Sequence, residues 1–466
     1  MNVMLLSLPG ITESDDGMFP LGIGYLAGML KPCHKVEAHY YQKMRQAKNE
    51  IPDNIIAFEP DIVGLTCNTF NRGFVCEIVK LIRTIDKNVK IILGGVHASF
   101  LYREVLKQYA ADIVVIGEGE YTLLELCNAI EQKIPLETVD GIAYTIDNEI
   151  KLNSPRQVIS NLDDLPMPDY SYGRPFMERT RMGFIITSRG CPARCKFCST
   201  SSYWGQKVRM HSPTRVVDEM EQLVSQFDVN KIYFHDDTFN LGVNRVLEIC
   251  KEIKDRGIKV AWACGCRVSC VTEEMIAAMV EAGCRCITWG VESGSEEMLK
   301  SIDKRISLSQ IRTAFELSGK FSEVMASASF TMVGNPGESE KTIQETVNFF
   351  NTLHMTDQIS PGILYVLPGT LLYEQLKNDG HIKDEDWHKY SSVPKYTLEK
   401  SYWTLNRWAN IVSKSGNRLP YDHRKHFWMG VQEPINLTKK IQRVAVQLHR
   451  WPSIIKRYLA AGRIRF

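Results

Sequence analysis

A chain of 466 residues is too long for a single hydrophobic core, so we expect two or three domains. Its apolar and charged fractions, 44% and 24%, are those of a folded soluble protein and exclude an intrinsically disordered chain. The formal net charge of +2 hides an asymmetry, because residues 401–466 hold thirteen Lys and Arg against two acidic residues, which leaves −9 for the rest of the chain.

The first residues do not resemble an export signal. Residues 2–6 read as a strand, and no apolar run approaches the roughly 18 residues of a membrane-spanning helix. We therefore expect a cytoplasmic, reducing location in which the thirteen cysteines stay thiols or bind metal.

The first 135 residues alternate apolar strand patterns with helical patterns. Strands are predicted at residues 3–8, 36–41, 61–67, 90–95 and 112–117, and helices among them at 21–30, 74–85 and 121–132. This alternation predicts an α/β domain at residues 1–140, an open, flavodoxin-like parallel sheet with helices on both faces. Ligands of such sheets bind beyond the carboxyl ends of the strands, here in the loops at residues 9–20, 68–72, 94–97 and 117–120.

A hairpin turning at Asp147 and Asn148 and a segment rich in Pro and Asp come next, and we expect a linker at residues 141–178. A second alternating region follows at residues 179–390. It has predicted strands at residues 183–187, 231–235, 260–264, 286–290, 328–333 and 362–366, with helices at 214–226, 243–256, 273–282, 308–318 and 339–353. Six such units predict a partial (β/α)6 barrel rather than a closed eight-stranded one.

The stretch T-S-R-G-C-P-A-R-C-K-F-C-S-T, residues 187–200, holds Cys191, Cys195 and Cys198 in one turn-prone loop. A structural zinc site takes four protein ligands and would need His211 or His235 as the fourth. An iron–sulfur cubane normally takes four thiolates, so three thiolates leave one iron open to a substrate or cofactor. The spacing favours the cluster, and the missing fourth cysteine makes the site reactive.

Between a strand and a βα barrel, C-P-A-R-C-K-F-C resembles the cluster motif of the radical S-adenosylmethionine (radical SAM) enzymes, with Phe197 at the motif's aromatic position. The resemblance implies that Cys191, Cys195 and Cys198 bind three irons of a 4Fe–4S cluster and that S-adenosylmethionine binds the fourth. It also implies that one electron, from a donor such as flavodoxin or ferredoxin, cleaves this cofactor to a 5′-deoxyadenosyl radical.

Three later strand ends resemble the family's cofactor-binding segments. They read F-H-D-D-T-F, G-V-E-S-G-S and M-V-G-N-P-G-E and begin at residues 234, 290 and 332. Their carboxylates suit the ammonium and ribose hydroxyls of the cofactor, and their glycines let the backbone approach its adenine. Alone, two aspartates are more typical of a helix cap, and an arginine is as typical of an ion pair. The expected S-adenosylmethionine ligands are Asp236, Asp237, Arg267, Glu292, Gly334 and Gly337.

The N-terminal domain resembles the cobalamin-binding domain of the radical SAM branch that includes the anaerobic magnesium-protoporphyrin monomethyl ester cyclase and the hopanoid-modifying enzymes. The resemblance rests on P-L-G-I-G-Y-L-A-G-M-L, V-G-L-T-C-N-T, I-I-L-G-G-V-H-A and D-I-V-V-I-G-E-G-E, which begin at residues 20, 63, 91 and 112. It implies cobalamin contacts at Thr66, Asn68, Gly94, Gly95, His97, Gly117, Glu118 and Gly119.

One cobalamin motif is missing from this domain. The sequence D-x-H-x-x-G, whose His coordinates cobalt in many cobalamin proteins, is absent, so we expect no protein His on cobalt. The alternative is an ordinary flavodoxin-like sheet that binds nothing, in which His97 is a satisfied polar residue.

Five further cysteines, Cys264, Cys266, Cys270, Cys284 and Cys286, fall in the barrel region. The period of two within each strand puts 264 and 266, like 284 and 286, on one strand face, which favours buried core thiols. A second cluster is the alternative.

Residues 391–466 are expected to form a basic, aromatic and mostly helical tail. Five of the eight Trp follow residue 386, and apolar residues after 441 recur every three or four positions between Lys and Arg. Packing on the body of the protein is the first expectation. A peripheral place on an anionic membrane and a cover over the barrel mouth are the alternatives.

These features together predict a cobalamin-dependent radical SAM enzyme that transfers a methyl group to an unactivated carbon of a small or lipid-like metabolite. Radical cyclisation or hydroxylation without methyl transfer is the nearest alternative. An RNA-modifying enzyme and a cluster-binding redox protein are alternatives of other classes. Nucleic acid is not expected as a partner, because no second cysteine triad and no appended RNA-binding motif are present.

Overall fold

The computed structural model describes residues 1–10, 19–356, 359, 361–389 and 393–419. These described residues form one compact unit. Most of the expected tail, including its predicted helices after residue 441, lies outside the described residues. None of the helices in the described ranges is both long and apolar enough to cross a membrane.

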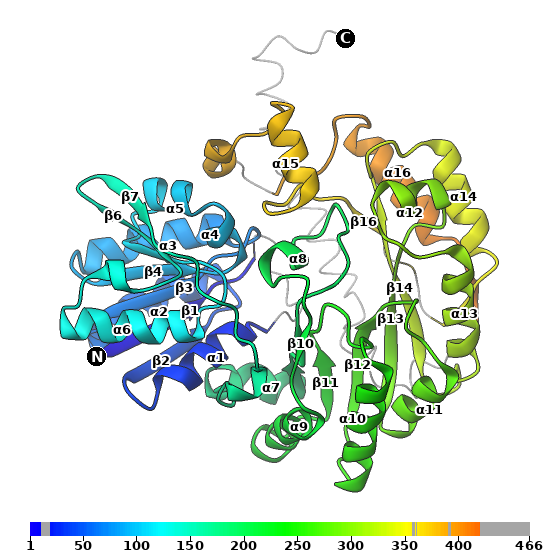
Figure 1. Ribbon diagram of the computed structural model, residues 1–466, viewed down its shortest axis with the longest axis horizontal. Helices are drawn as coiled ribbons and strands as arrows, with labels where there is room; N and C mark the ends of the chain where they lie inside the picture. The colour runs from blue at the N-terminus through cyan, green and yellow to red at the C-terminus, as the bar shows by residue number, and fades with distance from the viewer. Residues whose placement is uncertain (11–18, 357–358, 360, 390–392, 420–466) are drawn as a thin grey trace. The chain divides into compact units, whose positions relative to one another are not determined.

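The N-terminal sheet has five parallel strands followed by an antiparallel hairpin, in the order β2-β1-β3-β4-β5-β6-β7 (Figure 1). The parallel strands are β1 (Asn2–Ser7), β2 (Lys35–Tyr40), β3 (Ile62–Thr66), β4 (Lys90–Gly94) and β5 (Ile113–Val115). All five predicted strands are confirmed. β1, β3, β4 and β5 are mostly buried, as expected of strands covered on both faces, whereas the edge strand β2 is only partly buried.

The predicted hairpin consists of β6 (Ile142–Ile146) and β7 (Glu149–Leu152). Its turn residues Asp147 and Asn148 both have positive φ, 50° and 64°, as a two-residue hairpin turn requires. β6 pairs with β5, so the hairpin extends the N-terminal sheet as its edge. The expected boundary at residue 140 therefore falls inside this sheet.

Helices cover both faces of the sheet and bury two separate apolar clusters against it. They are α1 (Leu21–Leu30), α2 (Met44–Phe58), α3 (Arg72–Ile85), α4 (Val96–Phe100), α5 (Tyr102–Gln108) and α6 (Glu120–Gln132). The predicted helix at residues 21–30 is confirmed residue for residue.

The second region is the predicted six-stranded open barrel. Its parallel strands run in the order β16-β14-β13-β12-β11-β8, so the two end strands do not pair with each other. They are β8 (Met182–Ile185), β11 (Lys231–Phe234), β12 (Ala261–Cys266), β13 (Cys284–Glu292), β14 (Ala326–Val333) and β16 (Gly362–Ile363).

Figure 1 shows the barrel helices as an outer layer around these strands. They are α9 (Pro213–Phe227), α10 (Val243–Asp255), α11 (Glu273–Glu281), α12 (Glu296–Ser301), α13 (Leu308–Gly319) and α14 (Glu340–Phe350). The largest apolar cluster of the protein lies mainly between this layer and the strands. Cys264, Cys266, Cys284 and Cys286 are buried on β12 and β13, as expected of core thiols.

After the barrel come α15 (Leu371–Asn378) and α16 (Tyr402–Ser413). Leu405, Trp408 and Val412 of α16 are buried in the barrel's apolar cluster, whereas Trp403 is 82% exposed. The first helix of the expected tail thus packs on the barrel through one face.

Candidate functional site

The cysteine loop is closed at its base by a short antiparallel ladder. β9 (Ser188–Arg189) pairs with β10 (Arg209–Met210), and α8 (Thr200–Tyr203) lies between them in the chain. Gly190 has a φ of 97°, and a Cβ at this position would lie 2.5 Å from the Lys207 carbonyl oxygen. Only glycine fits there, so local sterics set the turn into Cys191.

The three predicted cluster cysteines line one cavity of about 220 Å³. Asp236, Asp237, Arg267 and Glu292, which follow or end β11, β12 and β13, line the same cavity. The structure therefore brings together all three predicted cluster ligands and four of the six predicted S-adenosylmethionine ligands. They converge because the carboxyl ends of parallel strands open at one end of a barrel.

Burial perturbs two of the three thiols that line this cavity. Burial raises the pKa of Cys195 and Cys198, while the Lys304 ammonium opposes the shift at Cys195 and hydrogen bonds from Thr200 oppose it at Cys198. In the described part of the chain, no three His, Cys, Asp or Glu side chains are grouped as ligands of one metal ion. A cubane places each thiolate on a different iron, so it needs separated sulfurs around one cavity.

Asp236 and Asp237 have different surroundings. The buried Asp236 carboxylate accepts hydrogen bonds from the Thr187 amide and hydroxyl, at 3.1 and 2.7 Å, and from the Ser188 hydroxyl. Asp237 is exposed to the cavity and accepts one hydrogen bond from the Thr200 hydroxyl at 2.8 Å. Asp236 thus holds the base of the cysteine loop, and Asp237 presents its carboxylate to the cavity.

Glu292 lies at a register shift between β13 and β14 and has a positive φ of 69°. Its carboxylate accepts a hydrogen bond from the Lys304 ammonium at 2.7 Å, and both side chains line the cavity. Arg267 donates to the carbonyl oxygens of Lys304 and Arg305. The sequence analysis did not predict Lys304 as a site residue. It lies in a loop without a recognisable motif, and its place in the cavity follows from tertiary contacts such as the pair with Glu292.

Gly334 and Gly337 do not line this cavity. Both have positive φ, 89° and 80°. A Cβ on Gly334 would lie 3.2 Å from the Leu405 side chain of α16, and the Gly337 amide donates to the Glu399 carboxylate at 2.9 Å. The backbone turn and the packing of the C-terminal segment account for these two glycines.

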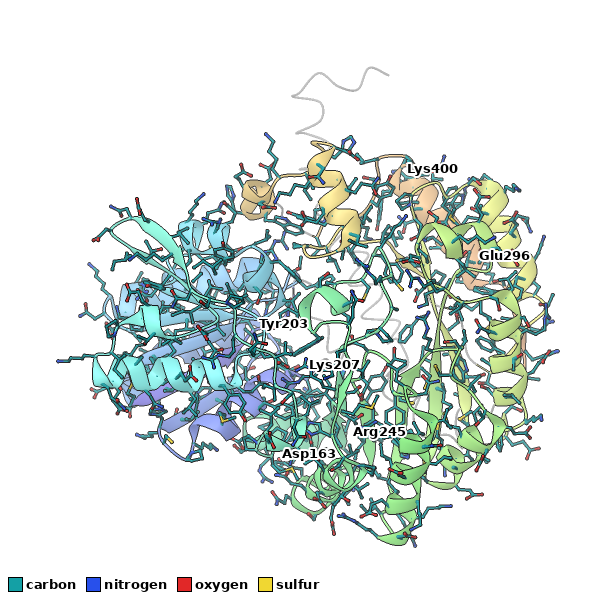
Figure 2. The ribbon with its side chains drawn as sticks, in the orientation of Figure 1. Asp163, Tyr203, Lys207, Arg245, Glu296 and Lys400 are labelled. Atoms are coloured by element: carbon teal, nitrogen blue, oxygen red, sulfur yellow. The ribbon has the colours of Figure 1, made fainter. Side chains whose placement is uncertain are left out.

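An aromatic wall completes the cavity. Tyr233 and His235 lie at the end of β11, and the half-exposed Phe330 comes from β14. The His235 ring stacks on Phe184 with centroids 5.1 Å apart, and burial lowers its pKa to about 4, so it is neutral near pH 7. The other histidine considered for zinc, His211, hydrogen-bonds instead to Asp163, labelled in Figure 2.

The predicted cobalamin contacts lie at the carboxyl ends of β3, β4 and β5, where several are engaged within the protein. Asn68 accepts hydrogen bonds from the amides of Phe70 and Asn71. His97 is 1% exposed, hydrogen-bonds to Thr69 at 3.3 Å and packs edge-on against Trp387. Burial lowers the pKa of His97 to about 3, so it is uncharged.

The predicted glycine contacts differ in the space around them. A Cβ on Gly95 would approach the Cys67 carbonyl oxygen to 3.0 Å, and one on Gly119 would meet Leu26 at 3.3 Å. Gly94 and Thr66 are paired across β3 and β4. Gly117 has a φ of 75°, and a Cβ added there would meet no atom of the described residues within 4 Å. A side chain at Gly117 would therefore meet open space among the described residues, and the positive φ is what favours glycine there.

The Glu118 side chain binds residues of the barrel domain. Its carboxylate accepts hydrogen bonds from Arg189 and Arg209 and from the Ile159 amide, and it is 8% exposed. This predicted cobalamin contact is therefore fully engaged with the base of the cysteine loop.

Comparison with known proteins assigns both regions. Residues 10–127 match the B12 binding domain, and residues 185–350 match the radical SAM superfamily. An uncharacterized methyltransferase of Pyrococcus horikoshii is 32% identical over 85% of this chain and 86% of its own length. The anaerobic magnesium-protoporphyrin IX monomethyl ester cyclase of Rubrivivax gelatinosus is 29% identical over 70% of this chain and 61% of its own length.

A solved structure shares the fold. It is a radical S-adenosylmethionine methyltransferase of Kitasatospora setae with tryptophan substrate and an S-adenosylmethionine analogue, and it has a TM-score of 0.72 at 20% identity, over 81% of this chain and 76% of that one. The chain belongs to the B12-binding radical SAM enzymes. It is a cobalamin-dependent radical SAM enzyme that uses a 4Fe–4S cluster and S-adenosylmethionine, and the predictions of fold, enzyme class and cofactors are confirmed.

Proposed function

We propose that this enzyme transfers a methyl group to an unactivated carbon of a small, apolar or lipid-like metabolite. The 32% identical relative of Pyrococcus horikoshii, described as a methyltransferase, supports this reaction. The cyclase of Rubrivivax gelatinosus, 29% identical, supports instead the nearest alternative, radical cyclisation without methyl transfer.

One structural observation carries the proposal: the carboxyl edge of the N-terminal sheet meets the carboxyl side of the barrel. Phe70, after β3, contacts Tyr365, after β16, with ring centroids 5.3 Å apart. His97, after β4, contacts Trp387, and Gly117, after β5, accepts a hydrogen bond from Tyr203 of the cysteine loop at 2.9 Å. A substrate between these edges can reach cofactors bound at both.

The side chains of the barrel cavity have separate roles in this proposal. Cys191, Cys195 and Cys198 hold the cluster, and Asp237 receives the ammonium or ribose of S-adenosylmethionine through charge-assisted hydrogen bonds. Glu292, already neutralised by Lys304, contributes a polar wall of low net charge. With one electron from a donor such as flavodoxin or ferredoxin, the cluster and S-adenosylmethionine supply the 5′-deoxyadenosyl radical, and cobalamin supplies the methyl group.

The surface presented to the substrate favours an apolar compound. Tyr233, Phe330 and the neutral His235 form one wall, and the ammonium that lines the cavity, that of Lys304, is paired with Glu292. An apolar wall retains a neutral hydrocarbon segment and excludes water that would quench a radical.

Isotope labelling tests methyl transfer. The reconstituted holoenzyme is incubated anaerobically with dithionite, a metabolite extract and S-adenosylmethionine carrying a trideuterated methyl group. We expect a product that carries all three deuterons and gains one CH2 equivalent over its precursor. 5′-Deoxyadenosine formed with a substrate change but no deuterium in the product would contradict methyl transfer and favour cyclisation or hydroxylation, the reaction class of the cyclase relative.

A further inference from the structure

Four buried charges connect the G-E-G-E loop of the N-terminal sheet with the base of the cysteine loop. Arg189 donates to Glu118 at 3.0 Å and to Glu120 at 2.5 Å. Arg209 donates to both oxygens of Glu118, at 2.7 and 2.8 Å. All four side chains are 2–7% exposed. Two arginines and two glutamates balance, so the cluster carries no net charge.

The geometry of the ladder makes this balance necessary. Arg189 and Arg209 are directly opposite each other in the β9–β10 pair, and like charges in that position repel. Water is excluded, so the repulsion is weakly screened. Glu118 accepts hydrogen bonds from both guanidinium groups and, together with Glu120, offsets this repulsion. Burial alone would lower the pKa of Arg189, but Glu120 and Glu118 raise it above its ordinary value.

β9 also connects to a residue that lines the cavity. Thr187 and Ser188, directly before Arg189, hydrogen-bond to Asp236, which lines the cavity beside the cysteines. Arg189 is followed by Gly190 and Cys191. A second contact runs in parallel, because Tyr203, labelled in Figure 2, donates its hydroxyl to the Gly117 carbonyl oxygen. Residues 187–189 thus link the two acidic side chains, because Arg189 binds Glu118 and the two residues before it bind Asp236.

We infer that Glu118 is a positioning residue for the cysteine loop: by neutralising Arg189 and Arg209 it lets the N-terminal sheet hold residues 190–208 in the cluster-binding conformation. Docking of the sheet is then a condition for an ordered cluster site. Glu118 acts through two arginines and touches no cofactor. The inference rests on the proposed role of the three cysteines, but its primary test needs no cofactor and no substrate.

Hydrogen exchange on the full apo chain tests the inference. In Glu118→Gln, which keeps the size of the side chain but leaves Arg189 and Arg209 with one carboxylate, we expect amide protection in residues 190–208 to fall by about tenfold or more. Protection in β12 and β13 is expected to stay within about twofold. The double variant E118Q/R209Q restores equal numbers of positive and negative groups, and we expect it to regain most of the lost protection.

Lys31→Ala is the matched control. It removes an ion pair elsewhere in the protein, between Lys31 at the end of α1 and Asp169 of the linker at 2.6 Å, and leaves the four charges unchanged. We expect wild-type protection in residues 190–208. In reconstituted protein, E118Q should lose iron to a chelator several-fold faster than wild type, and E118Q/R209Q should not.

Two results would overturn the inference. One is unchanged protection of residues 190–208 in E118Q. The other is an equal loss of protection in the barrel strands with no recovery in the double variant, because that pattern indicates a general structural role. Failure of methyl transfer in wild-type enzyme would leave the exchange pattern as predicted, so the two proposals fail separately.

Discussion

The barrel cavity and the carboxyl edge of the N-terminal sheet both carry predicted site residues, and the two regions use them differently. In the barrel, Cys191, Cys195, Cys198 and Asp237 converge on one cavity from segments far apart in the chain. At the sheet edge, His97, Asn68 and Glu118 are engaged in contacts within the protein. The predicted side chains therefore line the barrel cavity, whereas at the sheet edge they mainly form contacts within the protein.

The largest expected effect is at the cavity. Cys195→Ser removes a thiol that is 8% exposed and that would bind iron as a thiolate, and a serine hydroxyl is a poor ligand for iron at neutral pH. We expect the variant to lose nearly all cluster iron after anaerobic reconstitution while it still binds corrinoid, as measured by metal analysis and visible absorbance. Full iron retention would remove Cys195 from the ligand set.

The buried Glu219 of α9 tests the folding stability of the barrel separately from the chemistry of its cavity. The Tyr170 hydroxyl contacts both the Phe184 carbonyl oxygen, at 2.7 Å, and Glu219. A hydroxyl has one proton, so a protonated Glu219 satisfies both contacts. Burial raises the pKa of Glu219 from 4.5 to about 7. The folded state therefore binds this proton more tightly than the unfolded state does.

Stability contributed by the protonated Glu219 is fully present below pH 4.5 and is lost as the pH rises through about 7. The loss approaches about 3 kcal/mol at pH 8, from about 1.4 kcal/mol for each pH unit between the two pKa values. Glu219→Gln should be more stable than wild type at pH 8 and close to it at pH 5, by urea unfolding. Equal pH profiles for both proteins would contradict a neutral Glu219.

His97 tests the sheet side. Truncation to alanine leaves a cavity against Trp387 and removes the Thr69 contact, so we expect His97→Ala to lower the free energy of unfolding by about 2 kcal/mol. The visible spectrum of bound corrinoid should not change. A spectral shift with unchanged stability would indicate that His97 contacts the corrinoid, and it would contradict the purely structural role of His97 at the sheet edge.

Gly334 should show the smallest effect. Alanine at a φ of 89° is strained, and its Cβ would crowd Leu405 at 3.2 Å, so Gly334→Ala should cost about 1 kcal/mol of stability. Binding of S-adenosylmethionine, measured by equilibrium dialysis, should stay within about twofold of wild type, since Gly334 lies outside the cavity. A large loss of binding without a loss of stability would return Gly334 to the cofactor site.

Local sequence signals account for what could be predicted. Apolar runs and turn residues indicated the five parallel strands, the hairpin at Asp147 and the six barrel strands, because each signal spans a few neighbouring residues. The three cysteines were found for the same reason. Asp237 and Glu292 could be predicted as site residues because each follows or ends a recognisable strand.

Tertiary contacts account for what could not be predicted. Lys304 lines the cavity through tertiary contacts, an ion pair with Glu292 and a cation–π contact with the Phe197 ring. Gly334 was expected to serve the adenine, but Leu405 from α16 fills the space beside it. Glu118 lies in a loop whose position predicts a ligand, and only the docked barrel shows Arg189 and Arg209 as its partners. The partners in these contacts are far apart in the sequence, so no local sequence pattern predicts them.

Formation of 5′-deoxyadenosine tests the contrast between the two regions most directly. The reconstituted protein, supplied with S-adenosylmethionine and dithionite, is assayed as wild type, Cys195→Ser and His97→Ala at a temperature where all three are folded. We predict that wild type and His97→Ala release 5′-deoxyadenosine at similar rates and that Cys195→Ser releases none. No 5′-deoxyadenosine from wild type with a full complement of iron, or equal release from Cys195→Ser, would contradict the assignment of the chemistry to the barrel cavity.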